Sequence, residues 1–587
     1  MTVFPVPARR HYRNSSAKIA DIIAWFLVCF NAGRKECGEC AVREPLRAVR
    51  GGVAEGLIPS TIFPQQKKTT NCAYFKHFAF RTYSLNFSAK PKMIFQMPSP
   101  SALNIFRLFA IIFSMETRNI FDNISCLDHR YSISEKSVFG NLSKYISESA
   151  SILSCARAEA ALVKAHLSVR GILTAESEKI LDEAAANIDP EEVYAEEEKT
   201  QHNIRALVNV FKTKVPTEIA PLVHLGATSV DILDTALSMR VRDAIQNVVL
   251  PELKALENAL CDIAARECQT PQVGRTHGQH AVPITFGWSV AEFVSRLGKS
   301  ILRIEELSKQ LKGKLAGPVG AYNGPSMIVK DPEDLEKRYL EYVGLEPSEY
   351  SNQLVEPEYL LRLLLECNVA FGIIANLADD LRNLQRSEIG EVFEYFSSTQ
   401  VGSSTMPQKR NPWNSEHVKS LWKAFAPRVI TFFMDQISEH QRDLTNSASQ
   451  RFVSDYIAGF TMAVARMKKV VSGLQADREN MARNLENAGG KVRGGVLAEA
   501  AYILLAESGV SDAHEVIRKI TLEAEQTNAQ FFDVLKKHAD SYERIQAQLK
   551  KLGKDADVFF AKPENYHGLA SEKSKRLAEK YKELMQK

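Results

Sequence analysis

A polar loop between two apolar stretches holds the side chains of this sequence that are best suited to chemistry. It runs from Gly402 to Glu416 and reads GSSTMPQKRNPWNSE. Pro407 and Pro412 each remove a backbone donor, so a regular helix cannot continue through the loop. Two hydroxyls, two cations and an amide could bind a carboxylate and move a proton beside it: Ser403, Ser404, Lys409, Arg410 and Asn411. The alternative is an ordinary solvated surface loop.

Four further polar clusters lie at the boundaries of predicted helices, far apart in the sequence. They are QHN at 201–203, HLGATSVDILDT at 224–235, GRTHGQH at 274–280, and RDLTNSASQR at 442–451. In the second cluster, Thr228 or Ser229 can cap the helix that follows or bind an anion at its N-terminus. A single histidine in such a segment is more often structural than catalytic. Because a polar segment stands at the end of one predicted helix after another, we expect the fold to bring these segments together at the same height along the helix bundle.

Familiar motifs of other enzyme classes do not occur in the sequence. We find no nucleophile elbow, P-loop, dinucleotide fingerprint or HExxH. The pair Cys37 and Cys40 forms a CxxC without a second pair, so it does not complete a zinc site. The sequence therefore predicts neither a metal nor a cofactor.

Long helices must position these clusters. From about Phe121 onward the apolar spacing is helical, and we see no credible set of strands. Five long helices are predicted, over residues 229–268 with an interruption at Pro251, 283–311, 359–386, 416–437 and 455–474. Helices of this length usually bury their apolar stripes against partner subunits as well as each other. The fold class is therefore all-α, with a central long-helix bundle.

Changes in composition and in the helical spacing of apolar residues divide the chain into four parts. Residues 1–114 form a leader, residues 115–225 an N-terminal helical domain, and residues 226–474 the central bundle. After residue 474 the helical segments shorten and glycines punctuate them, so residues 475–587 are predicted to form a small C-terminal helical domain.

Charge is unevenly distributed between the leader and the rest. Residues 1–114 contain 16 Lys and Arg against 5 Asp and Glu, whereas residues 115–587 carry a net charge of −7. The body of the protein is therefore not a nucleic-acid binder on charge grounds. The leader's apolar runs, 22–30 and 108–113, are far shorter than a membrane span, so no membrane association is expected. Its Arg-rich composition indicates either a non-native extension or a targeting segment.

Cysteine usage indicates a reducing compartment. The nine cysteines are an odd number and form no regular framework. Free thiols are typical of cytoplasmic proteins, so we expect a cytoplasmic location.

The polar clusters resemble those of the fumarase/aspartase superfamily, in which three separated regions meet at each active site. GSSTMPQKRNP is similar to the superfamily's most specific motif. Within it, HLGATSVDILDT and GRTHGQHAVPITFG resemble the adenylosuccinate lyase branch, and Arg130-Tyr131 stands where that branch begins with an Arg-Tyr pair. The resemblance covers about Asp128 to the C-terminus. Gln201 and Asn203 depart from it, because the branch usually has a basic residue and an aspartate there.

The resemblance implies a three-domain fold, a homotetramer with shared active sites, and a lyase reaction. A fumarase/aspartase-like enzyme of this branch releases fumarate from adenylosuccinate to give AMP. It also releases fumarate from the succinyl-aminoimidazole carboxamide ribotide to give AICAR, in purine nucleotide biosynthesis. The substrate is a small nucleotide, and neither a cofactor nor a metal is required.

The same resemblance implies catalytic roles. Ser403 is the base, and its alkoxide is stabilised by Lys409 and by exclusion of water. His277 is the general acid, Glu416 holds its tautomer, and His202 assists at the purine or phosphate end.

Binding roles follow by resemblance as well. Thr228 and Ser229 hold one fumaryl carboxylate, while Lys409 and Asn411 hold the other with support from Gln353. Ser404 is a further substrate contact in the loop. The nucleotide phosphate and ribose are held by Arg130, Tyr131, Arg442, Ser447 and Arg451, because arginine suits bidentate recognition of phosphate.

Two alternatives stay open. A sister enzyme such as 3-carboxy-cis,cis-muconate cycloisomerase shares the GATSxD and QHAxPxTFG patterns, but usually lacks the histidine that stands here as His277. The phosphate-binding set also disfavours it. A non-catalytic structural relative would not need Ser403, His277 and Lys409, all of which are present.

Overall fold

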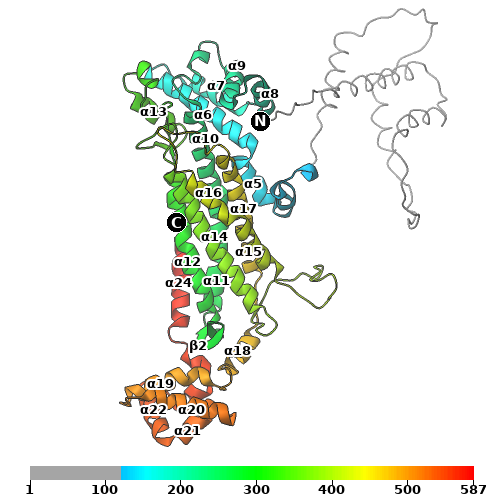
Figure 1. Cartoon of the computed structure of the whole chain (residues 1–587), viewed down its shortest axis with the longest axis vertical. Helices are drawn as coiled ribbons and strands as arrows, with labels where there is room; N and C mark the ends of the chain where they lie inside the picture. Colours follow the sequence, from blue (N-terminus) through cyan, green and yellow to red (C-terminus); the bar gives the residue numbers. More distant parts are fainter. Residues whose placement is uncertain (1–119, 587) are drawn as a thin grey trace, which may run out of the picture. The chain divides into compact units, whose positions relative to one another are not determined.

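The computed structural model describes residues 120–586, and the interpretation of residues 1–114 as a leader lies outside them (Figure 1). In the described part, helices make up nearly all of the regular structure. The predicted all-α class is confirmed.

Long helices run side by side in one bundle (Figure 1). Their apolar stripes meet in a single core that includes Leu253, Val294, Leu364 and Ala463. The bundle helices are α10 (Ser229–Ala244), α11 (Leu250–Arg266), α12 (Phe286–Lys309), α14 (Glu358–Leu384), α15 (Trp413–Phe425), α16 (Val429–Met434) and α17 (Val453–Ser472).

The interruption predicted at Pro251 is not a break. A π-helical turn, Ile245–Val249, joins α10 to α11, and Pro251 lies in the first turn of α11. Because the helix continues through Pro251, its missing N–H is a lost backbone bond, and it coincides with the π-helical turn just before it. The two helices are therefore continuous. The Thr228–Ser229 end of α10 lies outside the bundle core.

A second core belongs to the N-terminal helices α6 through α9, with α13 (Pro332–Glu341), whereas α5 (Lys136–Ile146) packs against the bundle core. The alanine-rich helix α6 (Glu148–Val169) is buried along most of its length. Helices α7 (Ala175–Ala186), α8 (Pro190–Thr200) and α9 (Asn203–Lys214) pack around it. Helix α10 enters this core through Ile232 and Met239, so it links the two cores.

A third core lies among short helices near the C-terminus. They are α18 (Arg478–Glu486), α19 (Ala498–Glu507), α20 (Ala513–Thr527), α21 (Phe531–Lys537), α22 (Ala539–Lys551) and α23 (Ala556–Ala561). The last helix, α24 (Ala570–Leu584), returns to the bundle and packs on α11 and α12. Gly298 permits this contact, because a Cβ there would overlap the Tyr581 ring of α24. The predicted domain boundaries stay a prediction.

The expectation of no strands is wrong for one segment. Residues 271–285 form an antiparallel hairpin of β1 (Pro271–Thr276) and β2 (Gln279–Thr285). Its two turn residues, His277 and Gly278, both have positive φ, as the tight turns of hairpins require. Helix α12 consequently begins at Phe286 rather than Pro283. Two-residue pairs, β3 (Lys312–Gly313) with β4 (Glu346–Pro347) and β5 (Val392–Phe393) with β6 (Gln475–Ala476), complete the strands of the described residues.

Candidate active site

The predicted catalytic loop leaves the bundle after β5 and returns at the start of α15 (Figure 1). Its two limbs touch, because Asn411 Nδ2 donates to Gly402 O at 3.1 Å. A Cβ at residue 402 would overlap the carbonyl oxygen of Lys409, so glycine is required there. Asn411 therefore shapes the loop.

Ser403 accepts hydrogen bonds from its own loop. The backbone N–H groups of Met406 and Thr405 donate to Ser403 Oγ at 3.0 and 3.3 Å. Donors aimed at an oxygen stabilise negative charge on it. The local fold thus suits a serine that must lose its proton.

A buried carboxylate fixes the end of the loop. Glu394 accepts from the backbone N–H and the hydroxyl of Ser415, at 2.7 and 2.6 Å, and from Asn414 Nδ2 at 3.0 Å. A carboxylate at this position also suits the N-terminus of α15. Glu394 was not predicted, because it lies 21 residues from Ser415 without a motif to mark it.

A cleft beside the loop is lined by four cations and three carboxylates. Arg382 in α14 and Arg386 just after it face Lys409 and Arg410 of the loop, and the carboxylates are those of Glu388, Glu394 and Glu416. The cations of this lining suit an anionic ligand. Three predicted site residues meet along it: Lys409, Asn411 and Glu416.

The predicted Arg130–Tyr131 pair lies beside the start of α15. Tyr131 Oη and His417 Nε2 are 2.8 Å apart. Burial lowers the pKa of His417, and the nearby charges of Arg466 and Arg130 lower it further. Arg466 also donates to Asn414 Oδ1 at 2.9 Å. His417 and Arg466 were not predicted, although His417 directly follows the loop motif.

The predicted carboxylate cradle lies where α9 and α10 begin. Ser229 Oγ and His202 Nε2 are 3.4 Å apart. Thr228 is the N-cap of α10, and its N–H donates to Asp231 Oδ2 at 2.8 Å. The predicted capping role is confirmed, and His202 is brought to the same helix end.

Asp231 also locks a distant loop against α10. Its carboxylate forms an ion pair with Lys314, and both side chains are fully buried. Lys314 Nζ donates to Gly317 O at 3.1 Å, and Gly317 N donates to Asp231 Oδ2 at 3.3 Å. Lys314 was not predicted, because it is 83 residues from its partner.

Two histidine contacts support the turn before Thr228. His224 Nδ1 lies 2.7 Å from Oε1 of the fully buried Glu159. His166 Nε2 donates to Leu225 O at 2.8 Å, and burial lowers the pKa of His166. A neutral His166 can donate this bond while Arg170 donates to its other ring nitrogen at 3.1 Å.

The predicted acid, His277, stands exposed at the tip of the β1–β2 hairpin. Arg275 pins this hairpin to Glu391 through two contacts, Nη2–Oε1 at 2.6 Å and Nη1–Oε2 at 3.2 Å. Glu391 is fully buried. Among residues 120–586, His277 and Glu416 share no hydrogen bond or ion pair, so their pairing stays a prediction.

The predicted phosphate segment lies between α16 and α17. Arg442 donates to Asp435 O, to Gln436 O at 3.3 Å and to Ser438 Oγ at 3.1 Å, so its guanidinium holds the end of α16. The backbone N–H of Gln353 donates to Gln441 O at 3.2 Å, which joins the Gln353 loop to this segment. Three other predicted residues are exposed: Ser404, Ser447 and Arg451.

One chain does not assemble the whole predicted site. Within residues 120–586, no hydrogen bond or ion pair joins the α9–α10 cradle, the catalytic loop and the His277 hairpin. Helix α9 and strand β2 lie at opposite ends of the bundle (Figure 1). No group of three or more His, Cys, Asp or Glu side chains in the described residues is arranged to hold a metal ion. That no cofactor is needed stays a prediction.

Comparison with known proteins places the chain in a class. The Lyase family matches residues 129–424, and the adenylosuccinate lyase C-terminal family matches residues 438–556. The crystal structure of 3-carboxy-cis,cis-muconate lactonizing enzyme from Pseudomonas putida superposes with a TM-score of 0.64, at 24% identity, over 76% of this chain and 97% of that one. The fold is therefore that of the fumarase/aspartase superfamily, and the protein is an enzyme, a lyase.

Curated relatives narrow the class. Adenylosuccinate lyase of Pyrococcus horikoshii is 34% identical over 432 residues, which cover 73% of this chain and 92% of the relative. Adenylosuccinate lyase of Archaeoglobus fulgidus is 33% identical over 468 residues, covering 78% and 99%. The chain belongs to the adenylosuccinate lyase family.

Proposed function

We propose that this lyase eliminates fumarate from adenylosuccinate to give AMP. We propose the same reaction on the succinyl-aminoimidazole carboxamide ribotide, to give AICAR, as steps of purine nucleotide biosynthesis. The observation that carries the proposal is the GSSTMPQKRNP loop, in which two amides donate to Ser403 Oγ and Lys409 lines the cleft beside the loop. Family membership supports the substrate class.

The elimination needs a base, a charge sink and an acid. Ser403 removes a proton from the carbon beside a carboxylate, and the carboxylate then carries extra negative charge. Lys409 and Asn411 stabilise that charge, which is the main electrostatic demand of the step. His277 then protonates the departing nitrogen, with Glu416 holding its tautomer and His202 assisting.

Substrate binding divides between the helix ends and the loops. One carboxylate lies at the N-terminus of α10 against Thr228 and Ser229, where the helix dipole and free N–H groups favour an anion. Asn411, Ser404 and Gln353 support the other. Recognition of the phosphate and ribose falls to Arg130, Tyr131, Arg442, Ser447 and Arg451.

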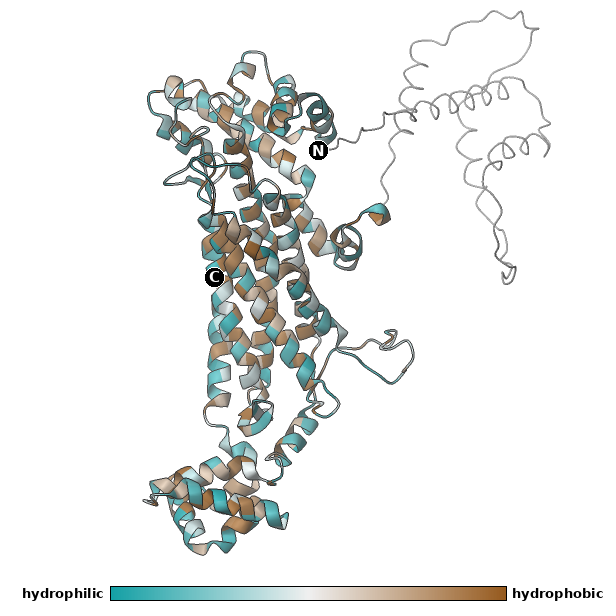
Figure 2. Ribbon diagram, in the orientation of Figure 1, coloured by the Kyte–Doolittle hydropathy of each residue, from teal (hydrophilic) through white to brown (hydrophobic). Residues whose placement is uncertain are grey.

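We infer that the active form is a homotetramer with shared sites. The cradle, the loop and the hairpin are separate within one chain, so further chains must bring them together. Apolar side chains that one chain leaves open also support assembly: Val369 of α14 is 52% exposed, and Phe433 and Met434 of α16 are 49% and 64% exposed. Figure 2 shows apolar residues along the bundle helices. Exposed apolar area of this kind is typical of subunit interfaces.

We place the enzyme in the cytoplasm. All five cysteines of the described residues are free thiols, as a reducing compartment favours. Helix α14 is the one described helix that is long and apolar enough to cross a membrane, and 56% of its apolar window is buried in the fold. This burial is that of a core helix.

The experiment is a substrate assay with the purified chain. Incubation with adenylosuccinate should change the ultraviolet absorbance as AMP forms, and the second substrate should release fumarate as well. Turnover of carboxymuconate without turnover of adenylosuccinate would establish the cycloisomerase instead. Inactivity on both would favour the non-catalytic relative.

A further inference from the structure

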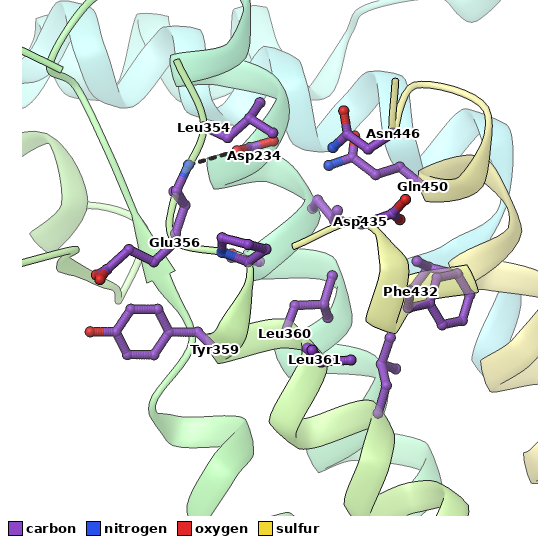
Figure 3. Close-up of a pocket in the computed structure, with 16 residues that line it drawn as sticks. Asp234, Leu354, Glu356, Tyr359, Leu360, Leu361, Phe432, Asp435, Asn446 and Gln450 are labelled. Atoms are coloured by element: carbon purple, nitrogen blue, oxygen red, sulfur yellow. Dashed lines mark hydrogen bonds between the residues drawn. The ribbon is translucent and has the colours of Figure 1, made fainter. Parts of the chain in front are cut away.

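A small pocket lies where three segments of the proposed site meet (Figure 3). Helix α10, which begins at Ser229 with Thr228 as its N-cap, forms one wall. The loop that contains Gln353 leads into a second wall at Leu354–Tyr359, and the segment between α16 and α17 forms the third. The proposed phosphate-binding residues Ser447 and Arg451 belong to that third segment. A residue shared by these walls can set the spacing of the substrate contacts.

Asp234 is that residue. It lies in α10, about one and a half turns after Ser229, and its side chain is only 7% exposed. Asp234 Oδ2 accepts from the backbone N–H of Val355 at 2.9 Å, the bond drawn in Figure 3. The side-chain amide of Gln450 lies near this carboxylate and favours its ionised form. Figure 3 shows the amide groups of Asn446 and Gln450 directed toward Asp234 from across the pocket.

The apolar surroundings of Asp234 make its polar contacts important for the position of the neighbouring segments. The rest of the pocket is largely apolar, with Leu237, Leu361 and Phe432 among its lining residues. A buried polar group without a partner is costly. If the carboxylate were removed, the Val355 N–H would lose its buried acceptor, and the Gln450 amide would lose the charge that it faces. Both would shift, and the two loops that they anchor would shift with them.

We propose that Asp234 is a positioning residue, which holds the Gln353 loop and the Ser447–Arg451 segment in register with the Thr228–Ser229 end of α10. Through these segments it sets the affinity of the site for its nucleotide substrate. The inference rests on the proposed function, since it takes those segments to be the substrate-binding ones.

The protonation of Asp234 gives an independent signature. Burial raises its pKa to about 6, although the Val355 N–H and the charge of Lys314 act in the opposite direction. The other ionisable groups near it are Asp231 in α10 and, around the pocket, Glu356, Tyr359 and Asp435. Protonation below pH 6 converts an acceptor oxygen into a donor. The KM should therefore rise as the pH falls through this value.

The test compares three variants of the full chain. Asp234→Ala should raise the KM for adenylosuccinate by about tenfold or more, because small misplacements of binding groups are costly, while kcat stays within about threefold. Asp234→Asn keeps an acceptor for Val355, so it should raise KM less and lose the rise in KM below pH 6. Asp243→Asn changes a carboxylate near the other end of α10 and should leave KM unchanged.

Equilibrium binding of AMP, measured by calorimetry, separates the inference from the proposed reaction. Weaker AMP binding by Asp234→Ala, beside a normal Asp243→Asn, supports the positioning role whether or not the chain turns substrate over. Wild-type chain that binds AMP but does not release fumarate would overturn the reaction alone. If Asp234→Ala melts at a lower temperature yet keeps its KM and AMP affinity, the role is merely structural and the inference is wrong. If the alanine variant does not fold, the asparagine variant and its pH profile decide in the same way.

Discussion

Ser403 concentrates the chemistry of the proposed reaction in one oxygen atom. The backbone amides of Thr405 and Met406 donate to it. A serine hydroxyl is a poor base in water, and only such donors and a neighbouring cation make its alkoxide accessible. The loop thus supplies the base and part of its activation together.

Replacing this oxygen tests the assignment. Ser403→Ala should lower kcat for adenylosuccinate by at least about a thousandfold, as loss of a catalytic group does, while calorimetry still detects substrate binding. Ser398→Ala, which removes an exposed hydroxyl earlier in the same loop, is the matched control and should keep most of the activity. Near-normal turnover by Ser403→Ala would assign the base to another residue.

Glu257 is an unusual residue of the bundle core. It lies fully buried in α11, and neither of its carboxylate oxygens has a hydrogen-bond partner among the described residues. Burial raises its pKa well above the ordinary value. The folded chain therefore keeps the acid protonated at pH values where the unfolded chain has ionised it.

This difference predicts how stability depends on pH. Between the unfolded pKa, about 4.3, and the higher folded pKa, the unfolded state binds fewer protons, so Glu257 lowers the free energy of unfolding as the pH rises. Glu257→Met should raise that free energy at pH 8 by about 1–3 kcal/mol, and by less at pH 5. Thermal melting at both pH values checks this. If Glu257→Met gains the same free energy of unfolding at pH 5 and at pH 8, Glu257 does not titrate in this way.

At the scale of elements, the catalytic loop keeps its shape through close contact between its two limbs. Residue 402 lies against the carbonyl oxygen of Lys409 and the ring of Phe396. A side chain there must push the limbs apart, which moves Ser403 relative to Lys409. The rest of the bundle does not depend on this contact.

Gly402→Ala should therefore separate activity from stability. We expect kcat/KM to fall by about a hundredfold, as misplacement of catalytic groups does, with a melting temperature close to that of the wild type. Gly140→Ala is the matched control, because a Cβ there meets no atom within 4 Å. Normal activity of Gly402→Ala would mean that the loop rearranges before it acts.

The helices and the irregular loop before α15 could be predicted from sequence, whereas the hairpin and the buried partners could not. Long stripes such as that of α14 repeat a helical period many times, so the pattern is strong. The hairpin at 271–285 is short, and its His-Gly turn lacks the usual Asn-Gly signal. Lys314 and Glu391 lie 83 and 116 residues from the groups that they hold. Only the folded chain brings them together.

At the scale of the whole molecule, association of several chains explains both the exposed apolar side chains and the separation of the proposed site residues within one chain. Val369, Phe433 and Met434 are exposed in a single chain. Strand β2, whose hairpin carries His277, lies at the opposite end of the bundle from α9, where the cradle begins (Figure 1). Assembly of several chains would bury the exposed apolar side chains and would bring the separate parts of the active site together. Symmetric homo-oligomers commonly build shared sites of this kind.

Mixing two inactive variants tests this explanation. If Ser403 and His277 of one site come from different chains, Ser403→Ala and His277→Ala subunits that are dissociated and reassembled together should regain activity. Random mixing of equal amounts would give about a quarter of sites with both residues intact, since each is present in half of the chains of a symmetric oligomer. Each variant taken alone through the same procedure should stay inactive, and a doubly substituted chain mixed with wild type should show no such gain. If pull-down through a tag on only one variant shows that mixed oligomers have formed and activity is still absent, both residues of each site lie on one chain.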